Sequence, residues 1–539
     1  MDGRGYGAYR SVEGACARLG ELLVRVSRVQ GDPFAPPSVV VVEAPSRLLP
    51  GWALEWPVPL ADWLHRRLYM LLGRASEKVG EGHSGLLAVP RPGPVVLRRS
   101  AVEVRGGRLR FRVWAGLPSR GRRVLGRAAA EMLLERLPRA VGEAVADAGR
   151  LEGQLGEHIY TWRLQEALRS QLRPRGLAAF VGDGSVLPRR CGGCEEPLPG
   201  AVPFESPPSL RVELEGPRGE AVSGMGVPRG VTVVAGSAFH GKSTLLEALA
   251  AGVWNHVPGD GRERVVTVRN AMYVKAEDGR FVSCVDVSSF IHDLPGGGST
   301  ECFSTSDASG ATSTAASIQE AVEAGAELLL LDEDTAASNI LYLDERAAPL
   351  TRWHTVTPIA SLARSMAERG VSLVIVSSGS LPLLAAADTV IVMEGYRARD
   401  STGLARELAR RHGVSPAGAE YKPPRPRVVQ GTPRLVKPKI RGGRLEDRAL
   451  QAPVDLSGDI HLVEGSQFNT LLLVARAHLA SLRGKPLAAA LSELESTMAE
   501  GGPQALAPGE PGPGLAEVRG LDVAFLVNRL PGLRARHSP

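Results

Sequence analysis

The sequence contains few cysteines and few aromatic residues. Of its 539 residues, 5% are Phe, Trp or Tyr and 5 are cysteine. The cysteines are Cys16, Cys191, Cys194, Cys284 and Cys302. Because their number is small and odd, it argues against a disulfide framework. The motif CGGC could form half of a zinc site, but no second ligand pair occurs at a suitable spacing, so we interpret its cysteines as loop residues.

Long apolar runs are also absent. No apolar stretch approaches the ~18 residues of a membrane-spanning helix. The first residues, MDGRGYGAYRSVEGA, are polar and unlike a secretory signal. We therefore expect a soluble, cytoplasmic protein with no membrane partner. The charge balance is less informative, because the 64 Lys and Arg exceed the 58 Asp and Glu by only 64 − 58 = 6, so local clusters matter more than the total.

The length of the chain predicts several domains. At about 150 residues per domain, the chain suggests about three. Residues 1–200 alternate short β-like runs with a helical block and predict an α+β domain. Residues 201–400 alternate strand and helix patterns, which is typical of an α/β domain with a parallel sheet covered by helices. Residues 401–539 predict a basic linker and a smaller, mainly helical C-terminal region.

A glycine-rich loop lies near the start of the second domain. The stretch VVAGSAFHGKSTLLEAL fits G-x-x-x-x-G-K-[ST] from Gly236 to Ser243. Its two glycines let the backbone curl so that successive N–H groups point at a phosphate, at the positive end of the following helix. Lys242 would then reach the β- and γ-phosphates, and the Ser243 hydroxyl would bind Mg²⁺. A chance glycine turn is the alternative, but the flanking strand and helix favour a nucleoside triphosphate site.

A buried strand that ends in two acids supplies the expected partner for the metal. In AELLLLDEDTAASN, four leucines lead to Asp332 and Glu333. We expect Asp332 to hold the Mg²⁺ sphere, directly or through water, and Glu333 to orient and deprotonate the attacking water. This stretch alone could be an ordinary strand end, but its combination with the Gly-Lys-Ser loop favours the catalytic interpretation.

A turn of small residues opens the helix that precedes this strand. It lies in STSDASGATSTAASIQEAVEAGA, where Gly310 stands 22 residues before Asp332. Free N–H groups and hydroxyls at a helix N-terminus form a second anion site. If this turn and the Gly-Lys-Ser loop are both strand-to-helix turns on one sheet, they cannot easily hold the same phosphates within one chain. We therefore expect ATP to be clamped between two copies, in a homodimer.

The order of these features resembles that of ABC-class ATPases, and more closely the family of predicted ATPases of the ABC class, which are soluble P-loop proteins. Matching stretches run the length of the chain: VQGDPFAPPS, VLGRAAAEMLLERLP, GDGSVLPRR, GMGVPRGVTVVAGSAFHGKSTLL, NHVPGDGRE, DVSSFIHDLP, FSTSDASGATS, LLLDEDTAASN and DTVIVM. The resemblance implies an ABC ATPase core, ATP and Mg²⁺ as cofactors, and ATP hydrolysis as the activity.

The resemblance also implies roles for individual residues. The phosphate cradle would comprise Gly236, Ser237, Ala238, Phe239, His240, Gly241, Lys242, Ser243 and Thr244. The signature that caps the γ-phosphate of a partner chain would comprise Ser309, Gly310 and Ala311. Ser243 and Asp332 would hold the metal, and Glu333 and Lys242 would carry the catalysis.

Two features depart from transporter-type ABC proteins. Where a switch histidine is expected after VSLVIV, the sequence has SSGS, from Ser377 to Ser380. No glutamine stands clearly where the loop between the two sites should coordinate Mg²⁺, and Asp286 or Ser288 is a candidate to replace it. The loss of the histidine argues against fast turnover.

Two basic stretches point to an anionic partner. The stretch from Pro90 to Arg127 has eleven arginines and one acid, and is either a solvated strand face or an anion-binding surface. The stretch from Lys422 to Arg444 has eight basic residues, five prolines and no acid, which predicts an extended basic arm. We expect an ATPase coupled to nucleic-acid binding, with RNA favoured. The alternative is a slow, ATP-gated module that binds a protein.

Overall fold

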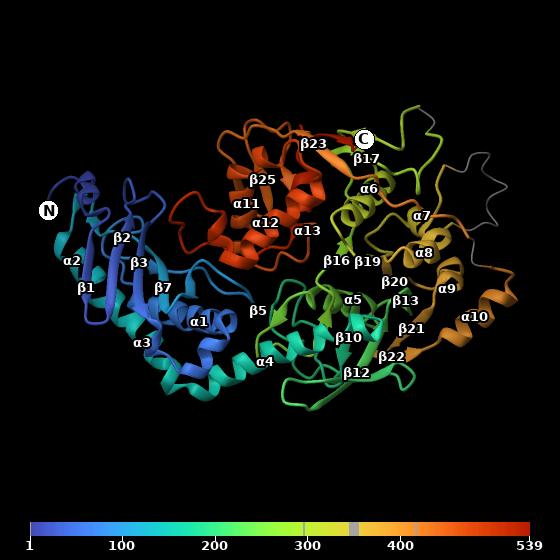
Figure 1. Ribbon diagram of the computed structural model, residues 1–539, viewed down its shortest axis with the longest axis horizontal. Coiled ribbons are helices and arrows are strands. Elements are labelled where there is room, and N and C mark those ends of the chain that lie inside the picture. The colour runs from blue at the N-terminus through green and yellow to red at the C-terminus, as the bar shows by residue number, and fades with distance from the viewer. Residues whose placement is uncertain (1, 295–296, 344–354, 416–417, 539) are drawn as a thin grey trace. The chain divides into compact units, whose positions relative to one another are not determined.

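The computed structural model describes residues 2–294, 297–343, 355–415 and 418–538, and it contains helices and strands along the whole chain (Figure 1). It divides into two compact units. The first comprises Met1–Trp162, Val463–Leu473 and Ser496–Val518, and the second comprises Arg163–Leu462, Val474–Glu495 and Arg519–Pro539. The first boundary therefore lies after Trp162, not near residue 200 as predicted. The C-terminal residues are shared by both units and do not form a separate region.

The first unit is an antiparallel sheet with helices packed on it. The sheet has the order β1 (Cys16–Leu19), β2 (Leu22–Arg28), β3 (Ser38–Pro45), β7 (Arg108–Ala115) and β4 (Leu87–Ala88), and β6 (Val102–Arg105) pairs with β7. The helices include α1 (Pro57–Ala75), α2 (Gly126–Glu131) and α3 (Leu137–Arg150), and α4 (Glu152–Ser170) follows them. Leu64 of α1, Phe111 of β7 and Val141 of α3 are completely buried in one core. The predicted α+β class of the N-terminal domain is confirmed.

Acids from other segments, together with Glu103 of the stretch itself, neutralise part of the arginine-rich stretch. Arg108 and Arg110 both pair with Glu43 of the neighbouring strand β3. Arg112 is buried and pairs with Glu103 and with Glu510, which lies nearly 400 residues further along the chain. These pairs weaken the interpretation of this stretch as an anion-binding surface, because its inner arginines hold strands together.

Arg99, in the same stretch, is another deeply buried arginine with acidic partners. Its side chain is 1% exposed and lies between Asp62, on α1, and Glu464, whose Oε2 is 2.8 Å from the guanidinium. Burial alone would raise the pKa of Asp62, but the guanidinium groups of Arg66 and Arg99 hold it well below its usual range. The two carboxylates can therefore remain ionised inside the unit because Arg99 pairs with both of them and Arg66 also pairs with Asp62.

Replacement of Arg99 by Met should lower the free energy of unfolding by about 3–5 kcal/mol, because it leaves the buried Glu464 carboxylate without its cation and removes one of the two that pair with Asp62. Chemical denaturation followed by circular dichroism would measure this loss. The matched control is Arg108→Met, whose exposed pair with Glu43 should contribute at most about 1 kcal/mol. Equal losses in the two variants would contradict this account of the buried pair.

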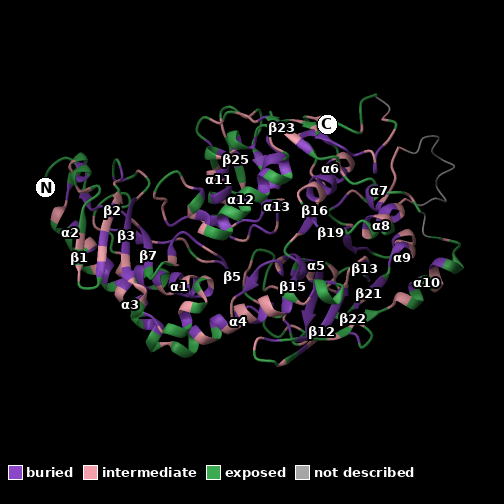
Figure 2. Ribbon diagram, in the orientation of Figure 1, coloured by how far each residue is buried: buried purple, intermediate pink, exposed green. Residues whose placement is uncertain are grey.

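The second unit is built on a six-stranded, mostly parallel sheet. The strand order is β16 (Ala271–Val274), β19 (Leu328–Asp332), β20 (Ser372–Val376), β13 (Val231–Ala235), β21 (Thr389–Glu394) and β22 (Arg397–Asp400). Only β22 runs antiparallel to its neighbour. All five parallel strands are largely buried (Figure 2), and four of them are rich in Val, Leu and Ile, as in a sheet covered on both faces. The predicted α/β fold with a P-loop is confirmed.

Helices and smaller sheets complete this unit. Its helices include α5 (Lys242–Ala251), α6 (Gly310–Glu323), α7 (Ser338–Leu341), α8 (Ile359–Glu368), α9 (Leu381–Ala386) and α10 (Thr402–Arg411). A second, antiparallel sheet has the order β11 (Arg211–Glu215), β12 (Ala221–Pro228), β10 (Leu177–Gly182) and β15 (Val265–Thr267). The strands β17 (Val282–Val285) and β18 (Phe303–Thr305) form a separate two-stranded sheet.

The predicted basic arm is partly paired with other strands of its unit, although many of its residues are exposed. Within it, β23 (Arg427–Gly431) pairs with β27 (Arg534–His537), and β24 (Lys439–Arg441) pairs with β25 (Arg444–Glu446). Arg427 is buried and forms an ion pair with Glu323 of α6. The prediction of an extended arm was therefore wrong for much of this segment. Its prolines exclude helix, but they leave room for short, two-stranded pairing.

The C-terminal segment contains the helices predicted there. They are α11 (Gly465–Ala477), α12 (Leu487–Gly501) and α13 (Gly520–Asn528). In the part of the chain that the structure describes, no helix is both long and apolar enough to cross a membrane.

The structure corrects the interpretation of the cysteines. Cys191 is joined to Cys194 and Cys284 to Cys302 by disulfide bonds, while Cys16 is free and exposed. An odd number of cysteines means only that at least one of them has no disulfide partner. It does not exclude disulfide bonds among the others. The partners Cys284 and Cys302 are 18 residues apart in sequence, and only the antiparallel pairing of β17 with β18 brings them together.

Candidate nucleotide site

The glycine-rich loop lies between β13 and α5, and both of its glycines are sterically required. Gly236 has φ 136°, and a Cβ there would come within 2.4 Å of the Met393 carbonyl oxygen. Gly241 has φ 97°, and a Cβ there would lie 3.0 Å from the ring of Tyr396. The loop is thus pressed against the end of β21, and it leads directly into the N-terminus of α5 at Lys242.

The structure brings together Ser243 and Asp332. The Ser243 hydroxyl donates a hydrogen bond of 2.8 Å to Asp332 Oδ2, and Asp332 is buried at the carboxyl end of β19. Lys242 Nζ donates to the Ser237 carbonyl oxygen at 2.9 Å and therefore lies over the loop. A hydroxyl and a carboxylate are oxygen ligands of the kind that Mg²⁺ prefers, so this pair could hold that ion.

Glu333 is held by donors on both of its oxygens. Tyr342 Oη donates to Oε1 at 2.7 Å, while the Ser377 hydroxyl donates to Oε2 at 2.9 Å. The Ser378 backbone N–H and hydroxyl also donate to Oε2, at 2.7 and 3.1 Å. Ser377 and Ser378 belong to the SSGS segment that stands where a switch histidine was expected. These serines therefore contact the Glu333 carboxylate from the position where the switch histidine was expected.

These hydrogen bonds govern the ionisation of Glu333. Burial alone would raise the pKa of this carboxyl, but the hydrogen bonds from Tyr342, Ser378 and Ser377 outweigh it and lower the pKa. Donors stabilise the ionised form. The carboxylate is therefore charged but a weak base as long as all its donors remain in place.

The signature turn opens α6. Ser309 is the N-cap of this helix, and its hydroxyl accepts a hydrogen bond from the Thr312 N–H at 3.3 Å. The preceding strand β18 pairs with β17 and not with the central sheet, so the assumption that both turns lie on one sheet was wrong. Over the described ranges, no hydrogen bond joins Ser309, Gly310 or Ala311 to the glycine-rich loop.

The candidates for the missing Mg²⁺ glutamine lie elsewhere. The register of β16 with β19 places the residue after Val274, which is Lys275, beside Asp332. Asp286 follows β17, and its Oδ1 accepts a hydrogen bond of 2.6 Å from the Ser288 hydroxyl. Among the residues described, neither Asp286 nor Ser288 bonds to Ser243 or Asp332. No contact thus supports their assignment as metal ligands.

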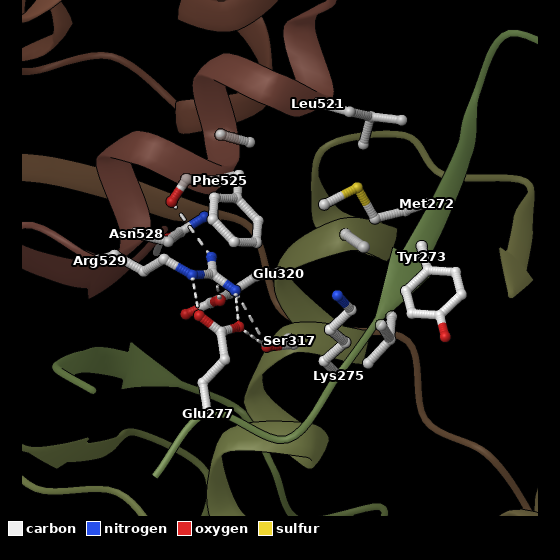
Figure 3. A pocket seen from close by; sticks show the side chains of 13 residues that line it. Met272, Tyr273, Lys275, Glu277, Ser317, Glu320, Leu521, Phe525, Asn528 and Arg529 are labelled. Carbon is white, nitrogen blue, oxygen red and sulfur yellow. Dashed lines mark hydrogen bonds and ion pairs between the residues drawn. The ribbon is translucent and has the colours of Figure 1, made fainter. Parts of the chain in front are cut away.

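A small pocket of about 20 Å³ lies where α13 meets β16 and α6 (Figure 3). Arg529, directly after α13, donates to Glu277 Oε2 at 2.7 Å and to the Ser317 hydroxyl of α6 at 3.3 Å. Figure 3 shows the Arg529 guanidinium pointing at Glu277, beside the ring of Phe525. The C-terminal helix is thereby fixed to the helix that begins with the signature turn.

Two residues near the site escaped the sequence analysis. Tyr342 lies nine residues after Glu333, and no spacing rule links a tyrosine there to the carboxylate. Tyr396 has φ 63°, is 47% exposed, and follows Gly395, whose N–H donates to His240 Nδ1 of the glycine-rich loop at 2.8 Å. An exposed tyrosine in a tight turn carries no sequence signal for a nucleotide site.

Comparisons with known proteins agree with this geometry. Residues 1–148 match a family described as the N-terminal domain of ATPases of the ABC class, and residues 151–425 match the P-loop domain of the ABC ATPase family. An uncharacterized protein of Methanocaldococcus jannaschii is 32% identical over 262 residues, which are 46% of this chain and 57% of that protein. The chain therefore matches little more than half the length of this relative.

One similar solved structure is that of cbiO1 from Clostridium perfringens, described as part of the ABC transporter complex cbiONQ. It has 15% sequence identity, covers 44% of this chain and 94% of its own, and has a TM-score of 0.25.

Replacement of Tyr342 by Phe should raise the pKa of Glu333, because it removes a donor that stabilises the carboxylate. If Glu333 acts as a base, the acid limb of the kcat/KM profile for ATP should move to higher pH. Steady-state phosphate release between about pH 5 and 8 would measure this. Tyr69→Phe is the control, since Tyr69 is an exposed tyrosine of α1. Superimposable profiles for wild type and Tyr342→Phe would contradict the role of this contact.

Proposed function

Because the chain belongs to the family of ABC-class ATPases, we propose that it binds ATP with Mg²⁺ and hydrolyses it at an interface between two copies of the chain. The observation that supports this most directly is the hydrogen bond between the Ser243 hydroxyl and the Asp332 carboxylate. It joins the end of a glycine-rich phosphate loop to the end of the strand that Glu333 follows, so a loop, a metal and a base could act on one phosphate there.

Each part of the site has a distinct task in this proposal. The backbone from Gly236 to Thr244 holds the phosphates, and Lys242 neutralises their charge. Ser243 and Asp332 would hold Mg²⁺, which supplies charge stabilisation at the β- and γ-phosphates. Glu333 accepts a proton from the attacking water once one of its oxygens is free of its present donors.

The dimer interface follows from the position of the signature turn. Ser309, Gly310 and Ala311 present the N-terminus of α6, a helix of 14 residues whose first N–H groups can bind an anion. No hydrogen bond joins them to the loop of the same chain over the described ranges. We propose that they cap the γ-phosphate held by a partner chain, which makes the site incomplete in one copy.

The Glu333→Gln variant should bind ATP but hydrolyse it ~10²-fold or more slowly, because it lacks the base. With ATP trapped, it should sediment as a dimer, and it should associate more weakly without nucleotide. Phosphate release and analytical ultracentrifugation would measure the two effects.

Asp334→Asn is the matched control for this variant. Asp334 is an exposed carboxylate one residue beyond Glu333, so its neutralisation should leave hydrolysis close to that of wild type. Near-normal turnover in Glu333→Gln would exclude Glu333 as the base. A strict monomer with ATP fully bound would exclude a shared site.

Slow turnover is favoured by a specific observation. Glu333 accepts four hydrogen bonds, and SSGS replaces the expected histidine. An ATP-gated module that binds a protein partner is therefore the second candidate function. Such a module would use ATP chiefly to change the association of two chains.

RNA binding is the first candidate for what the ATPase acts on. Four basic residues between β23 and β25 are exposed, and none has an ion pair in the described part of the chain: Arg434, Lys437, Lys439 and Arg441. In the same stretch, Arg425 pairs with Glu301 and Arg427 with Glu323. The charges of these four exposed residues are therefore available to a polyanion.

Neutralisation of these four residues to Gln should weaken binding of single-stranded RNA at every sequence tested. Each lost phosphate contact should also lower the slope of log affinity against log salt by ~0.7, because fewer counterions are released. Fluorescence anisotropy at several salt concentrations would measure both quantities.

The matched control removes four exposed arginines that already pair with acids: Arg369, Arg397, Arg399 and Arg411. It changes the net charge equally and should change the salt slope less. Equal effects of the two sets would exclude a specific patch. No measurable affinity for RNA or DNA, with or without ATP, would favour the protein-binding module.

A further inference from the structure

Three side chains that commonly bind metals meet at the hairpin that precedes the signature turn. Cys284 lies on β17, Cys302 directly precedes β18, and His537 ends β27. One sulfur or nitrogen atom of each lies within 4.8 Å of those of the other two. Residues 235 or more positions apart in sequence therefore converge here, and no part of the proposed ATPase chemistry uses them.

The backbone at Cys284 is distorted in a way that serves this convergence. The pairing Val282 with Thr305 and Val285 with Phe303 places an extra residue on β17, which is a β-bulge. Cys284 itself has φ 48°, in the left-handed region that side-chain-bearing residues rarely adopt. Such a conformation is maintained only where the surroundings impose it. A bulge of this kind changes the direction of a side chain, and here it turns the side chain of Cys284 toward Cys302.

The ring of His537 is held in a form that can bind a metal. Its Nε2 lies 2.6 Å from the Glu301 carbonyl oxygen, which can only accept, so the proton of the neutral ring is on Nε2. Its Nδ1 is buried and has no hydrogen-bond partner. A histidine whose one nitrogen donates to a backbone carbonyl, and whose other nitrogen has a free lone pair, is the usual arrangement of a metal-binding imidazole.

We propose that Cys284, Cys302 and His537 form a site for a thiophilic divalent cation such as Zn²⁺ when the disulfide is reduced. A dithiol reductant transfers two electrons and two protons, which breaks the S–S bond and yields two thiols and a cyclic disulfide of the reductant. The cation then replaces the two thiol protons. Two sulfurs and one imidazole nitrogen are ligands for Zn²⁺ rather than for Mg²⁺ or Ca²⁺, with water at the fourth position.

Occupation of this site would connect three segments around the signature turn. The hairpin leads from Thr305 to Ser309, the N-cap of α6. The strand β27 pairs with β23, where Arg427 stands opposite His537 and donates to the Ser283 carbonyl oxygen at 2.9 Å. A bound cation would hold the two strands of the hairpin together in place of the disulfide. Through His537 it would also connect them to β27. The proposed cation site does not require ATP to be bound.

Cobalt binding to the reduced full-length chain tests this proposal. The measurements use a Cys191→Ser/Cys194→Ser background, because the second cysteine pair could itself bind a metal. After reduction with dithiothreitol and anaerobic desalting, Co²⁺ should produce a thiolate-to-cobalt charge-transfer band that saturates at one equivalent, and Zn²⁺ should displace it. His537→Ala should weaken the affinity at least tenfold, and Cys302→Ser should remove most of the band.

The same polypeptide with its disulfide intact provides a control that does not depend on the folding of any variant. It should show no charge-transfer band. Absence of the band in the reduced chain, an equal band in the oxidised chain, or unchanged affinity in His537→Ala would each overturn the proposal.

Discussion

The hydrogen bond between Ser243 and Asp332 depends on the parallel alignment of three strands. The strands β13, β20 and β19 are neighbours that run in the same direction, so the loop after β13 and the acids after β19 emerge at one edge of the sheet. Burial of the apolar strands on both faces fixes their register, because a slip of one residue would exchange their two faces. The position of every candidate catalytic group therefore follows from the packing of Val, Leu and Ile side chains.

Buried ion pairs attach the distant C-terminal segments to this framework. Arg427 pairs with Glu323, which belongs to α6, and Arg529 pairs with Glu277, which contacts Ser313 and Ser317 of α6. Ions inside a protein need a partner, since an isolated buried charge is very costly. These pairs therefore select one docking position for each segment, and the first of them makes Arg427 unavailable to a partner.

The environment of Glu333 depends both on the alignment of the strands and on contacts between segments that are distant in sequence. Its donors come from the SSGS segment after β20 and from Tyr342 after the short helix α7, so its basicity depends on two segments at once. A movement of either segment would change the number of hydrogen-bond donors to Glu333 and thus the pKa of its carboxyl group. In the proposed ATPase, a site of this kind would couple hydrolysis to conformation without a histidine.

The sequence by itself determined the glycine-rich loop, the strand that ends in Asp332 and the helix that follows Gly310, because these depend on local rules of backbone freedom, apolar periodicity and capping. The α+β and α/β classes of the first two domains followed from the same patterns. The tertiary structure alone decided which charges remain free, which cysteines meet and what surrounds Glu333. Each of these depends on contacts such as Tyr342 with Glu333, Arg427 with Glu323 and Cys284 with His537, and no local pattern records a partner that is brought close only by packing.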